Sequence, residues 1–172
     1  MQAVVMAGGE GTRLRPLTSR QPKPMVPIVN RPMLEHTINL LKQHGFNDIV
    51  LTLHYLPDII KDYFQDGSEL GVKLHYLIEE KPLGTAGGVK NAEQFLDDTF
   101  LVISGDVLTD IDLSKALSFH KQSGAVATIV LTRVPNPVEY GIVITDKTGR
   151  VKQFLEKPGW GEVFSDTVNA GI

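Results

Sequence analysis

Glycines, arginines and a lysine follow closely after the first apolar run of the chain, AVVM. Gly8, Gly9 and Gly11 can adopt backbone conformations that other residues avoid, so that several amide groups converge on one anion. Arg13 comes next, and Lys23 lies between two prolines that restrict the backbone and hold the cation in place. This pattern indicates a site for phosphate groups, although the glycines alone are also compatible with a tight loop that binds nothing.

Two familiar phosphate-binding motifs do not fit this loop. A P-loop ends in Gly-Lys-Ser or Gly-Lys-Thr, and neither tripeptide occurs in the chain. The dinucleotide fingerprint G-x-G-x-x-G requires a third glycine where this chain has Leu14, and Pro16 follows soon after. We therefore expect a phosphate site of another kind.

The elements that must position this loop alternate between strands and helices. Short apolar runs predict strands at residues 3–6, 48–53, 72–78 and 99–104. Amphipathic stretches predict a helix from an N-cap at Asn30 to Gly45, and further helices at 56–64, 85–96 and 113–123. This order implies an α/β fold with a mostly parallel, helix-covered sheet, in which ligands bind beyond the carboxyl ends of the strands.

The second half of the chain is predicted to be rich in strands. Apolar runs at residues 125–134, 141–146 and 151–157 follow one another without gaps long enough for a helix. The letters DKTG predict a turn between the last two, so part of this region is expected to pair antiparallel. The final letters TVNAGI read as a strand that has just begun, from which we expect one domain over residues 1–172, truncated at its C-terminus.

Composition excludes several classes of site. The chain has no cysteine, which excludes disulfides, thiolate nucleophiles and cysteine-based zinc sites, and its histidines lack metal-ligand spacing and are read as structural or surface residues. A formal net charge of −3 provides no overall basic field for nucleic acid or an anionic membrane. No apolar run reaches the roughly 18 residues of a membrane span, and the first residues lack the pattern of a secretory leader. We expect a cytoplasmic protein that binds neither nucleic acid nor membrane.

Several spaced motifs together resemble those of the sugar-1-phosphate nucleotidyltransferases, also called nucleotide-sugar pyrophosphorylases. They are GGEGTRLRPLT, PKPMVPI, NRPM, EEKPLGTAGGV, VISGDVLTDIDL, EYGIV, EKP and NAGI, in this order along the whole chain. The resemblance is closest to the mannose-1-phosphate guanylyltransferase branch. It implies a Rossmann-like, three-layer, mixed and mostly parallel sheet of the nucleotide-diphospho-sugar transferase type, with Mg²⁺ as cofactor. It also implies nucleotidyl transfer from a nucleoside triphosphate, here GTP, to a sugar 1-phosphate, here mannose 1-phosphate, with release of pyrophosphate.

The same resemblance implies roles for individual residues. Arg13 and Lys23 are expected to be catalytic by neutralising charge on the triphosphate, whereas Arg15 is equally compatible with a structural role. Asp106 directly follows a predicted strand and is expected to ligate Mg²⁺, which takes one or two carboxylates together with phosphate oxygens and water. The nucleotide is expected to contact Ala7, Gly8, Gly9, Gly11, Thr12, Arg13, Glu79, Gly84 and Thr85. The sugar phosphate is expected to contact Gly141, Glu156, Lys157 and Asn169.

The choice of base depends on Glu79. Guanine presents N1–H and N2–H₂ as adjacent donors, which one carboxylate accepts together, whereas uracil and thymine suit a glutamine amide. Thymidylyl and uridylyl members resemble one another in carrying Gln at this place, and guanylyltransferases are similar to this chain in carrying Glu. Two alternatives stay open: Glu79 is a solvated carboxylate at a strand end, or the neighbouring Glu80 reads the base.

Other functions are compatible with the same fold. One is a glucose-1-phosphate thymidylyltransferase or uridylyltransferase, and another is a catalytically silent regulatory paralogue that binds the nucleotide sugar and controls a partner subunit. Intact Arg13, Lys23 and Asp106 argue against the silent paralogue. The sequence leaves the identity of the sugar open, and it is compatible with a homo-oligomer of the full-length parent.

Overall fold

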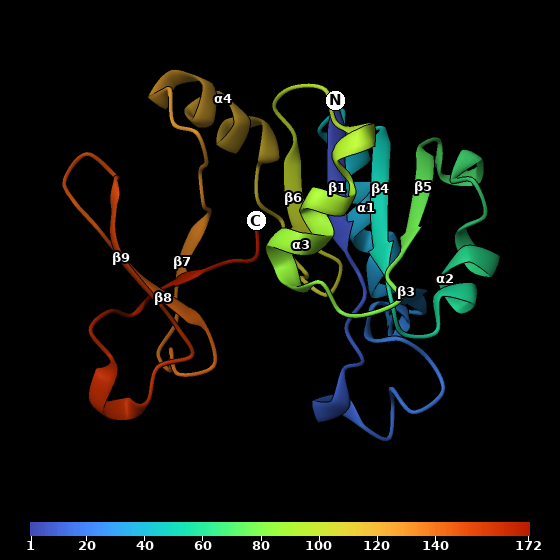
Figure 1. Cartoon of the computed structure of the whole chain (residues 1–172), viewed down its shortest axis with the longest axis horizontal. Coiled ribbons are helices and arrows are strands. Elements are labelled where there is room, and N and C mark those ends of the chain that lie inside the picture. The colour runs from blue at the N-terminus through green and yellow to red at the C-terminus, as the bar shows by residue number, and fades with distance from the viewer. The chain divides into compact units, whose positions relative to one another are not determined.

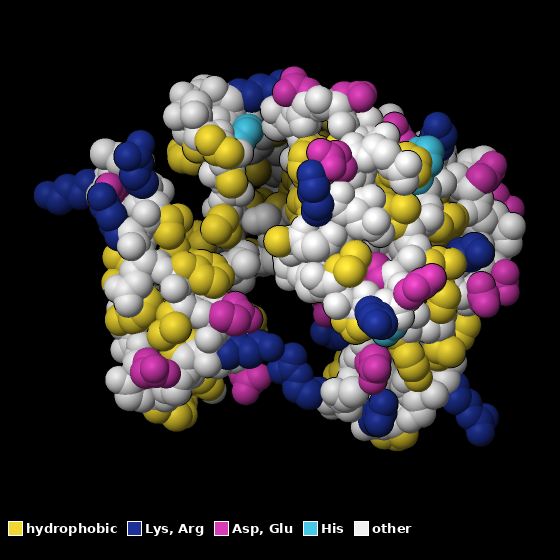
Figure 2. Space-filling view, viewed as in Figure 1, with side chains coloured by type: hydrophobic (Ala, Val, Ile, Leu, Met, Phe, Trp, Pro, Cys, Tyr) yellow, Lys and Arg dark blue, Asp and Glu magenta, His cyan; other side chains and the backbone are white.

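The computed structural model describes all 172 residues, which form two compact units, residues 1–115 and 116–172 (Figure 1). The first unit is an α/β structure around a parallel sheet, and the second is built on an antiparallel sheet. None of the helices has both the length and the apolar character that a membrane crossing needs. On the face shown in Figure 2, basic and acidic side chains alternate over the surface instead of forming a field of one sign.

A four-stranded parallel sheet of order β5-β4-β1-β6 forms the centre of the first unit. Its strands are β1 (Gln2–Met6), β4 (Asp48–Leu53), β5 (Lys73–Ile78) and β6 (Leu101–Ser104). The three central residues of β1 are fully buried, as expected for a parallel strand covered on both faces. Met6 pairs with Thr52 on β4 and with Ser104 on β6, so the segments that follow these three strands begin at one edge of the sheet.

Helices cover both faces of this sheet. Figure 1 shows α3 (Gly84–Asn91) in front of the strands and α1 (Met33–Gln43) behind them, which gives the first unit three layers. The predicted apolar stripe of α1, Leu34, Ile38 and Leu41, is completely buried. The α-helices are α1 (Met33–Gln43), α2 (Pro57–Phe64), α3 (Gly84–Asn91) and α4 (Leu113–Ser123), the last of which runs into the second unit. Short 3₁₀ turns are η1 (Thr12–Leu14), η2 (Lys23–Met25), η3 (Ser68–Leu70), η4 (Glu93–Phe95) and η5 (Trp160–Glu162).

The start of α1 differs from the prediction. Asn30 is not its N-cap, because the helix begins at Met33 with Pro32 in the N-cap position. Val29 and Asn30 instead form the two-residue turn of a small hairpin between β2 (Pro27–Ile28) and β3 (Arg31–Pro32), with φ angles of 50° and 62°. A turn of this kind needs positive φ at both positions, which asparagine tolerates well.

Two elements differ most from their predicted lengths. The helix expected over residues 85–96 ends at Asn91 and continues as the 3₁₀ turn η4, since three glycines in α3 weaken its preference for an α-helix. The strand expected over residues 125–134 is confined to β7 (Leu131–Arg133), which pairs with β10 (Thr167–Asn169), and backbone hydrogen bonds extend this pairing by one residue at each end, to Val130 and Val134.

The second unit contains an antiparallel sheet of order β7-β10-β8-β9, as the sequence predicts for this half of the chain. Its other strands are β8 (Gly141–Thr145), β9 (Val151–Glu156) and β10 (Thr167–Asn169). The predicted turn joins β8 to β9, where the side chain of Asp146 accepts hydrogen bonds from the backbone of Thr148 and Arg150. The mixed α/β architecture with a parallel central sheet confirms the predicted fold class.

Candidate functional site

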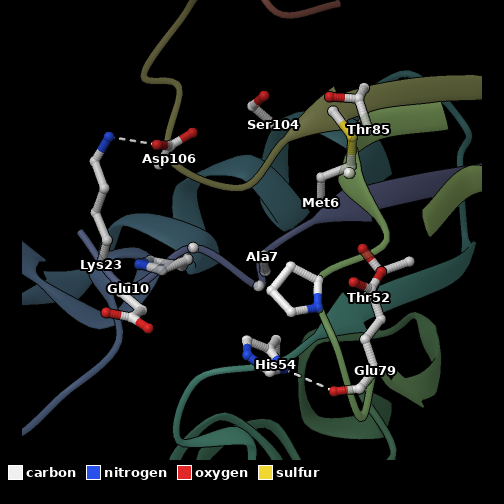
Figure 3. Close-up of a pocket in the computed structure, with 15 residues that line it drawn as sticks. Met6, Ala7, Glu10, Lys23, Thr52, His54, Glu79, Thr85, Ser104 and Asp106 are labelled. Atoms are coloured by element: carbon white, nitrogen blue, oxygen red, sulfur yellow. Dashed lines mark hydrogen bonds and ion pairs between the residues drawn. The ribbon is translucent and has the colours of Figure 1, made fainter. Parts of the chain in front are cut away.

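A pocket of about 410 Å³ lies at the carboxyl ends of the strands in the first unit (Figure 3). Its volume falls within the roughly 300–1,000 Å³ of typical small-molecule sites. The walls come from the loop after β1, from η2, from the ends of β4, β5 and β6, and from the first turn of α3. The lining residues are Met6, Ala7, Gly8, Gly9, Glu10, Lys23, Pro24, Thr52, His54, Glu79, Pro82, Gly84, Thr85, Ser104 and Asp106.

The two ends of the pocket differ in chemistry. Figure 3 shows Lys23, Glu10 and Asp106 together on one side, and Thr52 and Glu79 on the other. The glycine loop runs along the pocket between them, with Gly8 and Gly9 in its lining. The pocket therefore has a charged end beside the glycine loop and a second end with hydrogen-bonding groups between β4, β5 and α3.

At the charged end, Lys23 and Asp106 form an ion pair between Nζ and Oδ2. Lys23 is in η2 between Pro22 and Pro24, and Asp106 follows β6 after Gly105, whose amide donates to the Met6 carbonyl at 2.8 Å. Both side chains are about one-third exposed, at 28% and 33%. The pair thus presents a cation and an anion to the pocket, each within reach of a bound ligand.

Gly11 fixes the shape of the loop that carries this lysine. Its φ angle is +63°, and a Cβ at this position would lie 2.8 Å from Cβ of Lys23 and 3.0 Å from Cγ2 of the buried Thr18. The Thr18 hydroxyl donates to the Gly11 carbonyl at 2.7 Å. Only glycine allows both the backbone conformation and this close packing.

Three predicted nucleotide residues lie outside the pocket lining. Gly11 packs beneath the loop, while Thr12 and Arg13 are exposed in η1, directly after it. The predicted nucleotide, catalytic and metal residues that do line the pocket are Ala7, Gly8, Gly9, Lys23, Glu79, Gly84, Thr85 and Asp106.

At the other end, Glu79 directs its carboxylate toward the start of α3. Its Oε2 accepts a hydrogen bond from the Leu83 amide at 3.0 Å, where the helix dipole favours a negative charge. Its Oε1 lies against Gly88, since a Cβ on that glycine would be only 2.8 Å away. The neighbouring Glu80 is exposed and does not line the pocket.

The structure adds pocket residues that the sequence reasoning missed, among them Thr52, His54 and Ser104. His54 was expected to be structural or on the surface, yet it lines the pocket, with Nδ1 2.7 Å from the backbone oxygen of Glu79. Because a carbonyl oxygen only accepts, Nδ1 carries the proton. The signal available in the sequence was that each of these residues lies at or next to the carboxyl end of a predicted strand, but which side chains turn toward the pocket depends on the register of the sheet.

Asp106 is the carboxylate to test as a Mg²⁺ ligand. The structure contains no cluster of three or more histidines and carboxylates able to hold a metal by themselves. Mg²⁺ commonly binds through one or two carboxylates, with phosphate oxygens and water completing its shell. A single aspartate in a pocket that also presents a lysine and a glycine loop fits a metal held jointly with phosphates.

The predicted sugar-phosphate residues form a separate cluster in the second unit. Gly141 pairs with Glu156 across β8 and β9, and Asn169 is the neighbour of Val168, which pairs with Ile142 on β8. Three adjacent strands thus bring Gly141, Glu156 and Asn169 together. A Cβ on Gly141 would lie 2.7 Å from Oε2 of Glu156, so this glycine leaves room for the carboxylate.

Lys157 completes this cluster in an unusual backbone conformation. Its φ angle is 43°, and its amide donates to the Tyr140 carbonyl at 3.0 Å. Residues other than glycine seldom adopt positive φ, and such positions are concentrated at functional sites. The strand-end lysine is therefore held at a defined position beside Glu156.

The first unit has a parallel sheet with helices on both faces and a pocket at the carboxyl ends of its strands. This arrangement places the chain among the α/β proteins that bind their ligands at that edge of the sheet. Within that class, the chain belongs to the nucleotidyl transferase family, whose sequence profile matches residues 2–172. This finding confirms the resemblance seen in the motifs.

Curated relatives include enzymes of two base specificities. The chain is 42% identical over 186 residues to a UTP–glucose-1-phosphate uridylyltransferase from Synechocystis sp., covering 100% of this chain and 48% of the relative. It is 43% identical over 172 residues to a mannose-1-phosphate guanylyltransferase from Mycobacterium tuberculosis, covering 99% and 47%. The chain thus spans about half the length of the curated relatives it matches.

A solved structure supports the fold. A protein from Bacillus anthracis, described as a glucose-1-phosphate thymidylyltransferase in complex with a sucrose, matches with a TM-score of 0.89 at 27% sequence identity. The match covers 99% of this chain and 69% of that one. Both units of the chain therefore have counterparts in a single related structure.

Proposed function

We propose that this chain carries the nucleotide-binding and sugar-phosphate-binding residues of a mannose-1-phosphate guanylyltransferase. The reaction transfers GMP from GTP to mannose 1-phosphate and yields GDP-mannose and pyrophosphate. The observation that carries the proposal is the pocket itself, which has a lysine and an aspartate at one end and the Glu79 carboxylate at the other. A triphosphate placed at the charged end and a guanine at the Glu79 end would use both.

The reaction needs no protein nucleophile, and its main requirement is that the two substrates are held in the right position. An oxygen of the sugar phosphate attacks the α-phosphorus of the nucleotide, a new P–O bond forms, and the bond to the bridging oxygen breaks as pyrophosphate leaves. Because negative charge accumulates on the leaving group, fixed cations supply most of the rate enhancement. Lys23 would bind phosphate oxygens, and Arg13 would contribute to stabilising the leaving pyrophosphate.

Asp106 would hold Mg²⁺ together with the phosphates of the bound nucleotide. When bound, the metal neutralises charge on phosphate oxygens. Binding of the nucleotide would separate Lys23 from Asp106, since the lysine then pairs with a phosphate instead of the carboxylate.

Glu79 supports guanine as the base. Glu79 lines the pocket, whereas Glu80 is exposed and lies outside the pocket lining. This difference favours Glu79 over Glu80 as the residue that would bind the base. The Leu83 amide occupies one lone pair of Oε2, which leaves acceptor capacity on both oxygens for the adjacent N1–H and N2–H₂ donors of guanine.

The cluster in the second unit supports a sugar phosphate as the acceptor substrate. Glu156 and Asn169 provide polar groups suited to sugar hydroxyls, and Lys157 provides a cation suited to the sugar's phosphate. Gly141 pairs with Glu156 and has no side chain, which leaves room for the Glu156 carboxylate.

A second candidate is a glucose-1-phosphate uridylyltransferase. The observation in its favour is the 42% identity with a relative of that name over the whole of this chain, nearly the same as with the guanylyltransferase. The two candidates share the fold, the phosphate chemistry and the metal, and they differ in the base and the sugar.

A pyrophosphate-release assay on the intact protein separates these candidates. We expect turnover with GTP and mannose 1-phosphate, and a loss of roughly 10²-fold in kcat for Arg13→Ala, the effect of removing one preorganised group that stabilises the transition state. Glu79→Gln should lower the kcat/KM for GTP relative to UTP and dTTP. Preferred use of UTP with glucose 1-phosphate would replace the first candidate by the second, and no turnover with any pair of substrates would contradict both.

A further inference from the structure

Thr52 near the end of β4 is a polar residue that the reaction outlined above does not use. It is only 3% exposed, and the residues around it in β4, Ile49, Val50, Leu51 and Leu53, are apolar and equally buried. Its backbone oxygen accepts the Ala7 amide at 2.9 Å, while its side-chain hydroxyl has no hydrogen-bond partner in the protein. An unpaired hydroxyl in such surroundings costs stability that a valine of the same shape would not.

The hydroxyl of Thr52 faces the pocket. No side-chain oxygen or nitrogen that is sealed from solvent lacks a partner in this structure, so this unpaired hydroxyl is accessible to solvent, and its residue lines the pocket. A buried, unpaired polar group directed into a pocket indicates a bond that forms only with the ligand.

Thr52 and Glu79 face the same point of α3. A Cβ built on Gly88 would lie 2.8 Å from Oε1 of Glu79 and 3.6 Å from Oγ1 of Thr52. Figure 3 shows the two side chains on one side of the pocket, away from Lys23 and Asp106. The hydroxyl therefore lies at the end proposed for the base.

The order of hydrogen-bonding groups on guanine indicates which of them the Thr52 hydroxyl would bind. Its Watson–Crick edge presents N2–H₂, N1–H and O6 side by side, and a carboxylate accepts from the first two but has no hydrogen to offer O6. We propose that Thr52 is a specificity-determining residue whose hydroxyl donates to O6 of guanine while Glu79 accepts from N1–H and N2–H₂. This inference rests on the proposed function, since it assumes a guanine nucleotide in this pocket.

Isothermal titration of the purified protein with GTP and with ITP tests the assignment. ITP keeps O6 and N1–H but lacks the N2 amino group, so Thr52→Val should weaken both nucleotides alike, by roughly threefold to tenfold for one neutral hydrogen bond. Thr52→Ser keeps the hydroxyl and should stay within about twofold of the unmodified protein. The Tm of Thr52→Val should be unchanged or higher, because the valine methyl replaces an unpaired hydroxyl.

Other results would overturn the inference in distinguishable ways. If the protein binds GTP and Thr52→Val binds it equally well, Thr52 has no role in base recognition and the proposed function stands. A loss for GTP but not for ITP would place the bond at N2 instead of O6, and an equal loss in Thr52→Ser would attribute the effect to packing of the methyl group. Binding of no guanine nucleotide by the unmodified protein would overturn the inference together with the proposed function.

Discussion

Replacing Gly88 by alanine should separate the stability of this protein from its base recognition. Gly88 is buried in the interior of α3, where alanine favours the helix over glycine by about 1 kcal/mol. The added Cβ would lie 2.8 Å from Oε1 of Glu79, which is shorter than a carbon–oxygen contact allows. Because Oε1 is at the far end of a flexible side chain, whose other oxygen accepts the Leu83 amide, it can move by a few tenths of an ångström at little cost to the fold.

The same small movement should weaken nucleotide binding. A charge-assisted hydrogen bond contributes about 1.5–3 kcal/mol, and a displaced carboxylate loses most of its alignment with the base. We therefore expect Gly88→Ala to raise the Kd for GTP about tenfold or more, while the free energy of unfolding stays equal or rises by up to ~1 kcal/mol. Calorimetric titration with GTP and urea unfolding of the same preparations measure the two quantities.

A double-mutant cycle with Glu79→Gln identifies the cause. If Gly88→Ala acts by displacing the carboxylate, it should have little further effect on GTP binding once Glu79 has been replaced. Unchanged GTP affinity in Gly88→Ala would refute the reasoning, and so would an effect that simply adds to that of Glu79→Gln. A clear fall in stability would show that the Cβ displaces the backbone instead of the carboxylate.

Three further predictions concern the metal, the sugar site and acid stability. Asp106→Asn should abolish Mg²⁺-dependent turnover and change the free energy of unfolding by about 1 kcal/mol or less, because its ion pair is partly exposed. Gly141→Ala should raise the KM for the sugar phosphate more than it lowers kcat, because its Cβ would lie 2.6 Å from Cζ of Phe154 and 2.7 Å from Oε2 of Glu156 and would displace the carboxylate. Hydrogen bonds from Thr148 lower the pKa of Asp146 from 3.8 to about 2, so its contribution to stability is complete above pH 3.8 and lost as the pH falls toward 2.

Each of these predictions has a control. Asp110→Asn removes an exposed carboxylate of the same loop and should leave turnover intact, so equal losses in both variants would remove Asp106 from the metal site. Gly161→Ala introduces a Cβ with no atom within 4 Å and should leave the KM unchanged. For Asp146, urea unfolding of Asp146→Asn should show a stability deficit at pH 5 that shrinks toward pH 2, and a deficit independent of pH would contradict the linkage.

Most helices and strands could be predicted from the sequence because the patterns that indicate them lie within short segments of the chain. Apolar runs of strand length alternating with amphipathic stretches predicted the parallel sheet and the helices, and the buried stripe of α1 follows from a repeat of 3.6 residues. The predicted bounds of helices and strands were wrong where a turn or a partner strand determines where the element begins. Asn30 belongs to a hairpin turn, and the strand expected from residue 125 begins only where the chain meets its partner strand near residue 130.

Which site residues lie close together depends on the register in which the strands pair, and the sequence does not show this register. The sequence gives the residue types for phosphate and metal binding, but only the pairing of Met6 with Thr52 and with Ser104 places the ends of three strands at one edge. Likewise, only the pairing of Gly141 with Glu156 shows which carboxylate the glycine accommodates.

Thr52 shows most clearly what the sequence by itself could not determine. In the sequence Thr52 is a polar residue among the apolar residues of DIVLTL, a run that predicts a buried strand without distinguishing a core threonine from one that faces a pocket. The difference depends on the space left by Gly88 and on the approach of Glu79 from the neighbouring strand. Local propensities determine that a strand forms, whereas the functional meaning of its side chains depends on residues brought beside it from elsewhere in the chain.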